Sequence, residues 1–244
     1  MRKDGRMSTQ MRPMRFTPGF SKHPAGSVLV EAGNTVVLCN ITVEEGVPGW
    51  MRHLRNRKGW MTAEYCMIPS ATHSRNKRER NYVSGRSQEI QRLVGRSLRG
   101  VLDLSKCPDI TFVLDCEVLQ ADGGTRTAAI TGGWVALKLA IDKGLREGKI
   151  SESPITDTVA AVSVGLKNNE LFVDLDYVED STADLDMNIV MTQSGKLQEV
   201  QGTAEGLGFS VAQMNEILEA AQGSISNIFE LQQRAAEEGG VVEG

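Results

Sequence analysis

The residues best suited to chemistry are Gly124, Thr125 and Arg126, which stand between a predicted strand and a predicted helix. The strand is the β-rich run 110–119, and apolar residues recur at helical spacing from about residue 127 to residue 147. Glycines let backbone N–H groups approach a ligand, and a helix N-terminus offers unpaired donors to an anion. Thr125 adds a hydroxyl group, and the Arg126 guanidinium matches two phosphate oxygens. The stretch therefore predicts a phosphate site, with a simple tight turn as the alternative.

A second group of polar residues could hold a metal ion. Asp184, Asp186 and Asn188 alternate with apolar residues, so a strand would place them on one polar face. Asp180 lies in the preceding turn and could fold back towards Asp186. Clustered carboxylates suit hydrated Mg²⁺, which takes one or two of them together with phosphate oxygens. The alternative is an acidic strand that faces solvent.

A third feature is Arg86, in the first turn of a helix predicted from Ser84 onwards. A cation at this position opposes the helix dipole. Such an unfavourable choice is tolerated where the side chain serves a ligand, although a salt bridge would also explain it. The apolar side of this helix comprises Ile90, Leu93, Val94, Ser97 and Val101.

The charge distribution is strongly uneven. The whole chain has a net charge of −4, yet the segment 52–99 contains 12 Lys/Arg and 3 Asp/Glu. A basic segment on an acidic body favours a polyanionic partner, with a solvated charged loop as the alternative. Only 5% of residues are aromatic, so a nucleic acid would be held mainly through its backbone.

The remaining pattern predicts strands followed by long helices in both halves of the chain. We expect a hairpin over 26–41, strands at 59–65, 158–165, 171–177, 185–191 and 196–203, and a last helix capped by Ser210 with a frayed end at 235–240. Residues 4–13 show too little periodicity to fold alone, so they form either a loose tail or an arm. The linker 150–154 divides the chain into predicted halves 1–150 and 151–244, packed as one unit.

Length and composition indicate the class of protein and the compartment in which we expect it. The 244 residues, 40% of them hydrophobic, can bury a substantial core. No apolar run approaches the roughly 20 residues that span a bilayer, and the charged start has no apolar signal region. The four cysteines show no C-x-x-C spacing, so we expect reduced thiols in a cytoplasmic protein without a membrane or zinc partner. His53 and His73 are interpreted as surface residues.

Several of these segments resemble one known family. Gln-Ala-Asp-Gly-Gly-Thr-Arg-Thr followed by Ala-Ala-Ile-Thr-Gly is similar to the signature of the bacterial ribonuclease PH family. Gly-Arg-x-x-Glu-Ile-Gln-Arg-Leu around Arg86 and Glu-Asp-Ser-x-Ala-Asp-x-Asp-Met-Asn around Asp186 match the same family. The resemblance runs from Asp4 to about Leu218. It departs at the loop 47–59, which is more basic here.

The resemblance implies an α+β fold of the ribosomal protein S5 domain 2-like type, with mixed β-sheets packed against long helices. It also implies a nucleotidyltransferase: a phosphate-dependent 3′-to-5′ exoribonuclease that trims tRNA precursors, with ribosomal RNA as a further substrate. It would release nucleoside diphosphates and, in reverse, add nucleotides from them. The family assembles as a ring, commonly a homohexamer built as a trimer of dimers.

Site roles follow from the same resemblance. Inorganic phosphate, the co-substrate, would be held by Arg86, Gly124, Thr125 and Arg126. Asp180 and Asp186 would be catalytic and would hold Mg²⁺, with Asp184 as a third candidate ligand. The candidate RNA-binding residues are Arg75, Lys77, Arg78, Arg80, Arg92 and Arg96. Three alternatives are a ring subunit that serves as a scaffold, a hydrolytic exonuclease and a plain RNA-binding module.

Overall fold

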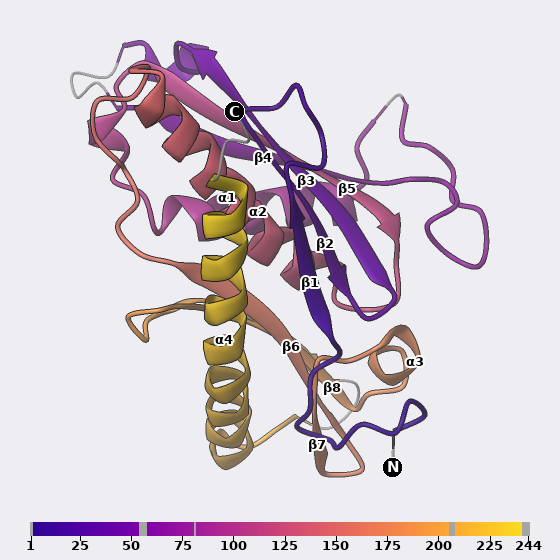
Figure 1. Ribbon diagram of the computed structural model, residues 1–244. Helices are drawn as coiled ribbons and strands as arrows, with labels where there is room; N and C mark the ends of the chain where they lie inside the picture. Colours follow the sequence, from indigo (N-terminus) through magenta and orange to yellow (C-terminus); the bar gives the residue numbers. More distant parts are fainter. Residues whose placement is uncertain (1, 54–57, 81, 205–207, 241–244) are drawn as a thin grey trace.

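The predicted α+β architecture is confirmed. The computed structural model describes residues 2–53, 58–80, 82–204 and 208–240, and these residues form two β-sheets, four α-helices and two single-turn 3-10 helices (Figure 1). The two short 3-10 helices are Gly49–Met51 and Leu104–Lys106.

The first sheet has five strands in the order β1-β2-β3-β5-β4. Its neighbouring strands run antiparallel except for β4 and β5, which run parallel. The predicted hairpin is confirmed, because β2 and β3 pair from Ala32↔Thr35 onwards. The strands are β1 Met14–Pro18, β2 Gly26–Ala32, β3 Thr35–Glu45, β4 Trp60–Met67 and β5 Ile110–Gln120.

Two helices, α1 Gly85–Arg99 and α2 Thr125–Arg146, share a core with this sheet. Most of α2 is buried, so its position is fixed by packing on all sides. Gly132 allows this close approach, because a Cβ there would lie 2.8 Å from the side chain of Val30 on β2. The helix begins at Thr125, two residues earlier than predicted, so Thr125 and Arg126 both lie in its first turn.

The second sheet has four antiparallel strands in the order β7-β6-β8-β9. They are β6 Val159–Lys167, β7 Glu170–Val173, β8 Leu185–Thr192 and β9 Leu197–Ala204. The predicted strand 171–177 is wrong beyond Val173. Asp174 adopts a left-handed conformation (φ 54°) that turns the chain, and the segment then forms the one-turn helix α3, Tyr177–Asp180. Asp176 and Glu179 form a capping box that fixes the start of α3.

Helix α4, Val211–Gly240, connects the part of the fold built on the first sheet with the part built on the second sheet (Figure 1). The predicted cap is confirmed, because Ser210 Oγ accepts a hydrogen bond from the Gln213 backbone at 3.2 Å. The predicted fraying is wrong: Ala235 and Ala236 are buried, and the helix continues to Gly240. Gln232 Nε2 donates to the carbonyl oxygens of Thr131 on α2 and Val159 on β6, so α4 ties both halves together.

The N-terminal segment is an ordered arm, which overturns the alternative of a loose tail. It runs beside β7 and α3 (Figure 1), and Arg2, Arg6 and Arg12 are all buried. Below, "the N-terminal arm" means residues 2–12. Periodicity could not reveal this order, because the arm is held by hydrogen bonds and ion pairs rather than by an apolar face.

Two expectations from composition can be compared with the structure. The four cysteines, all within the described residues, are free thiols, as predicted. Across the described ranges, the structure contains no helix with both the length and the apolar character needed to cross a bilayer.

Candidate active site

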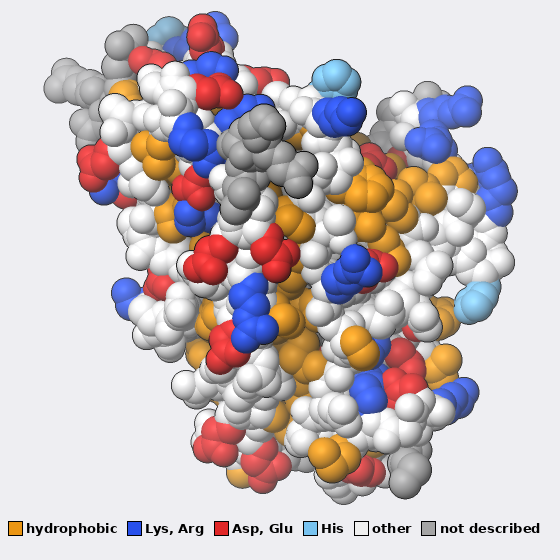
Figure 2. All heavy atoms as spheres, viewed as in Figure 1, with side chains coloured by type: hydrophobic (Ala, Val, Ile, Leu, Met, Phe, Trp, Pro, Cys, Tyr) orange, Lys and Arg blue, Asp and Glu red, His pale blue; other side chains and the backbone are white. Residues whose placement is uncertain are grey.

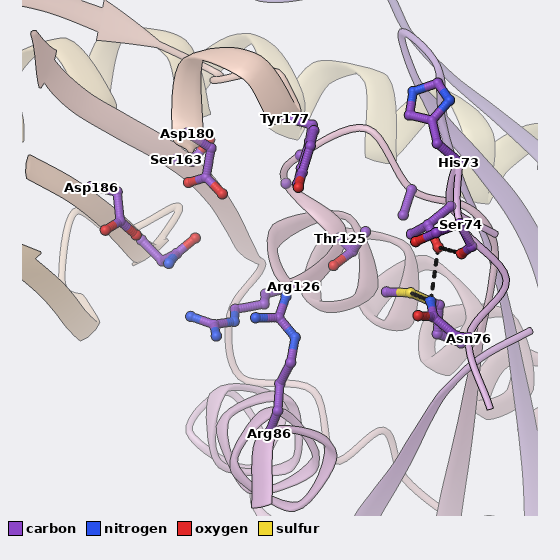
Figure 3. A pocket seen from close by; sticks show the side chains of 16 residues that line it. His73, Ser74, Asn76, Arg86, Thr125, Arg126, Ser163, Tyr177, Asp180 and Asp186 are labelled. Atoms are coloured by element: carbon purple, nitrogen blue, oxygen red, sulfur yellow. Dashed lines mark hydrogen bonds between the residues drawn. The ribbon is translucent and has the colours of Figure 1, made fainter. Parts of the chain in front are cut away.

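One cavity of about 440 Å³ collects the predicted phosphate and acidic residues (Figure 3). Its walls come from both halves of the chain, which the resemblance requires but the sequence pattern alone does not show. The predicted residues on its wall are Arg86, Gly124, Thr125, Arg126, Asp180 and Asp186. The others are Met67, Thr72, His73, Ser74, Asn76, Ala121, Gly123, Ser163, Tyr177 and Asn188.

The glycine pair is required by the backbone. Gly123 and Gly124 have φ of 74° and 66°, a region that residues with a Cβ rarely adopt. A Cβ on Gly123 would also overlap the carbonyl oxygen of Leu175 in the second half of the chain. Gly124 is the N-cap of α2, so the unpaired N–H groups of that helix open beside the cavity. The tight turn and the predicted anion-binding N-terminus are therefore compatible, because the turn itself brings the start of α2 to the cavity.

A tyrosine on strand β4 orients the hydroxyl group of Thr125. Tyr65 on β4 donates its phenolic hydrogen to Thr125 Oγ1 at 2.8 Å, so the Thr125 hydroxyl keeps its own hydrogen for another acceptor. Burial raises the pKa of Tyr65, and the positive charges of Arg86 and Arg126 oppose that shift only in part. Tyr65 consequently remains a neutral donor.

Arg86 and Arg126 extend into the same space from different helices (Figure 3). Arg126 Nη2 lies 3.3 Å from Glu89 Oε2, and Glu89 Oε1 accepts from Gln201 Nε2 at 3.0 Å. Glu89 thus holds the Arg126 side chain through a contact to Nη2. The helix that carries Arg86 begins at the N-cap Ser84, whose Oγ accepts from the Ser87 backbone.

The acidic side of the cavity faces these arginines. Asp180 ends α3 and Asp186 lies on β8 (Figure 3). Asn188, two residues after Asp186, lies on the same face of that strand. Burial raises the pKa of Asp180, the charge of Asp186 raises it further, and Arg126 and Arg86 oppose the rise. Two carboxylates that repel each other in a partly buried place favour a cation between them.

The residues present fit a hydrated divalent cation better than an all-protein metal cage. Among the described residues, no group of three or more His, Cys, Asp or Glu is arranged to hold a metal. A carboxylate pair nevertheless suits Mg²⁺, which retains waters and takes phosphate oxygens. Asp184 is not on the cavity wall: it is exposed and its Oδ2 accepts from the Asn168 backbone at 2.6 Å. Its carboxylate is therefore used by the β6–β7 turn.

Sequence reasoning missed several wall residues. Ser163 and Tyr177 come from segments with no chemical motif, and His73, interpreted as a surface residue, is exposed and also lines the cavity with Ser74. Asn188 was predicted to lie on the polar face of the acidic strand but was given no role in the site. Its place two residues after Asp186 on the same face of β8 is what brings it to the wall.

The candidate RNA-binding residues lie outside the cavity wall. A loop projects from the body on the right of Figure 2, where lysine and arginine side chains gather. Its exposed members are Arg75, Lys77, Arg78 and Arg80. Arg92 and Arg96 are exposed on α1, and Arg96 Nε is paired with Glu199 at 3.0 Å. Arg55 and Arg57 of the basic segment, within the divergent loop 47–59, lie outside the described residues.

Comparison with known proteins shows the family to which the chain belongs. Residues 10–141 match the 3′ exoribonuclease family, domain 1, and residues 157–224 match domain 2 of the same family. Ribonuclease PH of Mycolicibacterium gilvum (strain PYR-GCK) is 50% identical over 239 residues, covering 97% of this chain and 91% of that protein.

Solved structures show the same fold at low identity. Rrp46 of rice (Oryza sativa) superposes with a TM-score of 0.77 at 18% identity, covering 96% of this chain and all of that one. An Archaeoglobus fulgidus exosome, solved with RNA bound to the active site, gives 0.77 at 21% identity, with 94% and 91% coverage. An archaeal exosome core gives 0.73 at 21% identity, covering 95% of this chain and 90% of that one.

The chain belongs to the 3′ exoribonuclease family, which both of its halves match. Its identity to a ribonuclease PH over almost the whole length places it in the phosphorolytic branch of that family. It is accordingly a nucleotidyltransferase that uses inorganic phosphate to remove nucleotides from RNA 3′ ends.

Proposed function

We propose that this cavity phosphorolyses the 3′ ends of tRNA precursors, with Arg86, Gly124, Thr125 and Arg126 holding phosphate and Asp180 and Asp186 holding Mg²⁺. The observation that carries the proposal is the placement of two arginines and two carboxylates on the wall of one cavity. Phosphate and the scissile phosphodiester are both anions, so a site that brings them together must offset two negative charges. A hydrolytic site has no need of a second anion pocket.

The reaction follows from this arrangement. A phosphate oxygen attacks the last phosphorus of the chain, and the bond from that phosphorus to the preceding 3′ oxygen breaks. The new bond makes a nucleoside diphosphate, and the proton of the attacking hydrogen phosphate ends on the released 3′ hydroxyl. Phosphate itself is the nucleophile, so no Ser-His-Asp arrangement is needed.

Each side of the cavity contributes a separate effect. The α2 N-terminus, the Thr125 hydroxyl and the two guanidinium groups would orient phosphate for attack in line with the leaving oxygen. Bound Mg²⁺ would supply neutralisation of charge on the scissile phosphate and the leaving oxygen. Asp180 and Asp186 would hold it there with fixed carboxylate oxygens, while Asn188 and Ser163 offer neutral polar groups beside them.

The substrate and the assembly are part of the proposal. Arg75, Lys77, Arg78, Arg80, Arg92 and Arg96 would bind the RNA backbone, which explains a basic segment away from the chemistry. Two of the similar solved structures are exosomes, one of them with RNA bound to its active site. We propose for this chain a ring of identical subunits, a hexamer built from dimers, in which the projecting loops would meet the tRNA body.

The test uses a tRNA precursor with a short 3′ extension. With phosphate and Mg²⁺, the protein should shorten the extension and release nucleoside diphosphates, and sedimentation should show a hexamer. Chelation should stop turnover, and titrated Mg²⁺ should restore it. Trimming that is indifferent to chelation would contradict the metal role, and a monomer with full activity on the precursor would contradict the ring.

A further inference from the structure

The two halves of the proposed site lie on different substructures. Thr125 and Arg126 begin α2, which packs against the first sheet. Asp186 lies on β8 of the second sheet, and Asp180 lies on α3, in the connection between β7 and β8. Phosphorolysis requires the attacking phosphate and the scissile phosphate to be aligned. Misplacement of such groups by about 1 Å can cost a hundredfold in rate. The structure must therefore contain contacts that fix the distance between the phosphate side and the carboxylate side of the site.

Beside the cavity, the phosphate side and the carboxylate side meet where residues 122–124 face residues 174–177. The backbones pack so closely that Gly123 has no room for a Cβ against Leu175 and Asp176. The Tyr177 backbone N–H donates to Asp122 Oδ1 at 3.4 Å, which is a weak direct link. The stronger link runs through a third segment, the N-terminal arm.

Arg12 of the arm bonds to both sides of this junction. On the acidic side, its Nε and Nη2 donate to the two oxygens of Asp174 at 2.9 and 2.6 Å, and its backbone N–H donates to Oδ2 at 2.8 Å. On the phosphate side, its Nη1 donates to the Asp122 carbonyl at 2.5 Å and its Nη2 to the Gly123 carbonyl at 3.5 Å. One planar guanidinium thus connects the turn before α3 to the glycine turn before α2.

Arg12 reaches the site only indirectly. It is buried, with 6% of its surface exposed, and it is not among the residues that line the cavity. Its Nη2 lies 3.0 Å from the position that a Cβ of Gly124 would take, directly behind the predicted anion turn. Any effect of Arg12 on the reaction must therefore pass through the residues it holds.

A second arginine of the arm secures the far end of the same segment. Arg2 donates to both oxygens of Glu179, at 2.7 and 2.5 Å, and to the carbonyl oxygens of Val173 and Asp174. Glu179 precedes Asp180, and α3 contributes no buried residue of its own. The arm thus replaces the apolar packing that α3 lacks.

We infer that Arg12 is a positioning residue for phosphorolysis: it sets the separation of the phosphate side and the carboxylate side of the cavity. The inference rests on the proposed roles of those two sides. It assigns the N-terminal arm to the catalytic apparatus, although no arm residue touches the reacting groups. A lysine cannot reproduce the contact, because one ammonium cannot span a carboxylate and two carbonyl groups as a planar fork does.

The test is the variant Arg12→Lys, with Arg15→Lys as a matched control. Arg15 is an exposed arginine three residues further along the same chain segment. The measurements are kcat for a short RNA at saturating phosphate and Mg²⁺, the dissociation constant of phosphate, and thermal unfolding. We expect Arg12→Lys to lower kcat ten- to a hundredfold while phosphate affinity changes less than about threefold. The control should change none of these quantities.

Three results would overturn the inference. They are an unchanged kcat, a loss of phosphate affinity as large as the loss of kcat, and an equal loss of kcat in Arg15→Lys. Asp174→Asn keeps every donor of Arg12 and removes the negative charge that Arg12 pairs with. It should therefore also lower kcat while leaving phosphate affinity nearly unchanged. Combined with Arg12→Lys, it should lower kcat little further. If Arg12→Lys does not fold, Asp174→Asn decides by the same criteria. The unsubstituted protein shows separately whether phosphorolysis occurs at all.

Discussion

The two sides of the cavity are built in opposite ways. The phosphate side stands on α2, a helix of 22 residues that is mostly buried and packed against the first sheet. The carboxylate side depends on α3, a single turn with no buried residues, held by polar contacts from the N-terminal arm. The phosphate side is positioned by the core, whereas Asp180 on the carboxylate side is positioned by buried ion pairs of the arm. We therefore expect them to respond differently to substitution.

The largest effect should come from the carboxylate pair. Asp186→Asn or Asp180→Asn preserves shape and removes one charge, so kcat should fall by about a hundredfold or more, since metal stabilisation of the transition state is worth several kcal/mol. Asp184→Asn is the matched control, because Asp184 is exposed and outside the cavity. Its kcat should stay within about twofold. Near-normal turnover in both pair variants would make this side a solvated acidic face.

The phosphate side should show the next largest effect, and it should appear in phosphate affinity. A charge-assisted hydrogen bond contributes about 1.5–3 kcal/mol, so Arg126→Ala should lower the efficiency of phosphate use ten- to a hundredfold. Arg234→Ala, an exposed arginine on α4 outside the cavity, is the control on a short oligonucleotide. An Arg126→Ala enzyme that uses phosphate as well as the unsubstituted protein would separate this residue from the anion site.

A smaller change should follow from Glu89→Gln. Glu89 holds Arg126 at 3.3 Å in a partly exposed contact, and such pairs contribute up to about 1 kcal/mol. Phosphate affinity should fall by no more than about fivefold, with kcat at saturating phosphate unchanged. Kinetics at varied phosphate measures both quantities. A loss as large as that of Arg126→Ala would show that Glu89 does more than orient the guanidinium.

The smallest effect on the chemical step should come from the projecting loop. Replacing Arg75, Lys77, Arg78 and Arg80 by glutamine should leave turnover of a short, saturating oligonucleotide intact. Binding of a tRNA precursor should weaken, and the slope of log K against log salt should become shallower by as much as about 3. Sedimentation of the variant checks assembly. Unchanged binding and slope would leave the loop without an RNA role, and a dissociated variant would place it at a subunit contact.

The same contrast explains what the sequence could and could not predict. Gly124, Thr125 and Arg126 are contiguous, so a strand, two glycines and a helix predict that part of the phosphate side, and the structure places the start of the helix two residues earlier than predicted. Arg86 was recognisable because a cation in a first helical turn is locally unfavourable. Period-2 alternation predicted Asp184, Asp186 and Asn188 on one face. Asp186 and Asn188 line the cavity from β8, whereas Asp184 precedes that strand and does not reach the cavity wall.

The carboxylate side was harder to predict because its support is distant in sequence. Asp174 turns the chain at φ 54°, where an extended continuation to residue 177 was predicted, and no local pattern marks that turn. Its partners Arg12 and Arg2 lie 162 and 172 residues away, in a segment without periodicity. Burial of ion pairs leaves no trace in an apolar pattern. The order of the arm could therefore be seen only in the structure, whereas the Asp-x-x-Glu spacing of Asp176 and Glu179 was an unused local signal for the start of α3.

The most direct test of the account follows the attacking group itself. Radiolabelled inorganic phosphate is supplied with Mg²⁺ and an unlabelled RNA, and the released nucleotides are separated. If the arginine side of the cavity holds the nucleophile, the label appears as the β-phosphate of nucleoside diphosphates, and release stops when phosphate is left out. Unlabelled nucleoside monophosphates, formed at the same rate without phosphate, would contradict the account and assign the attack to water.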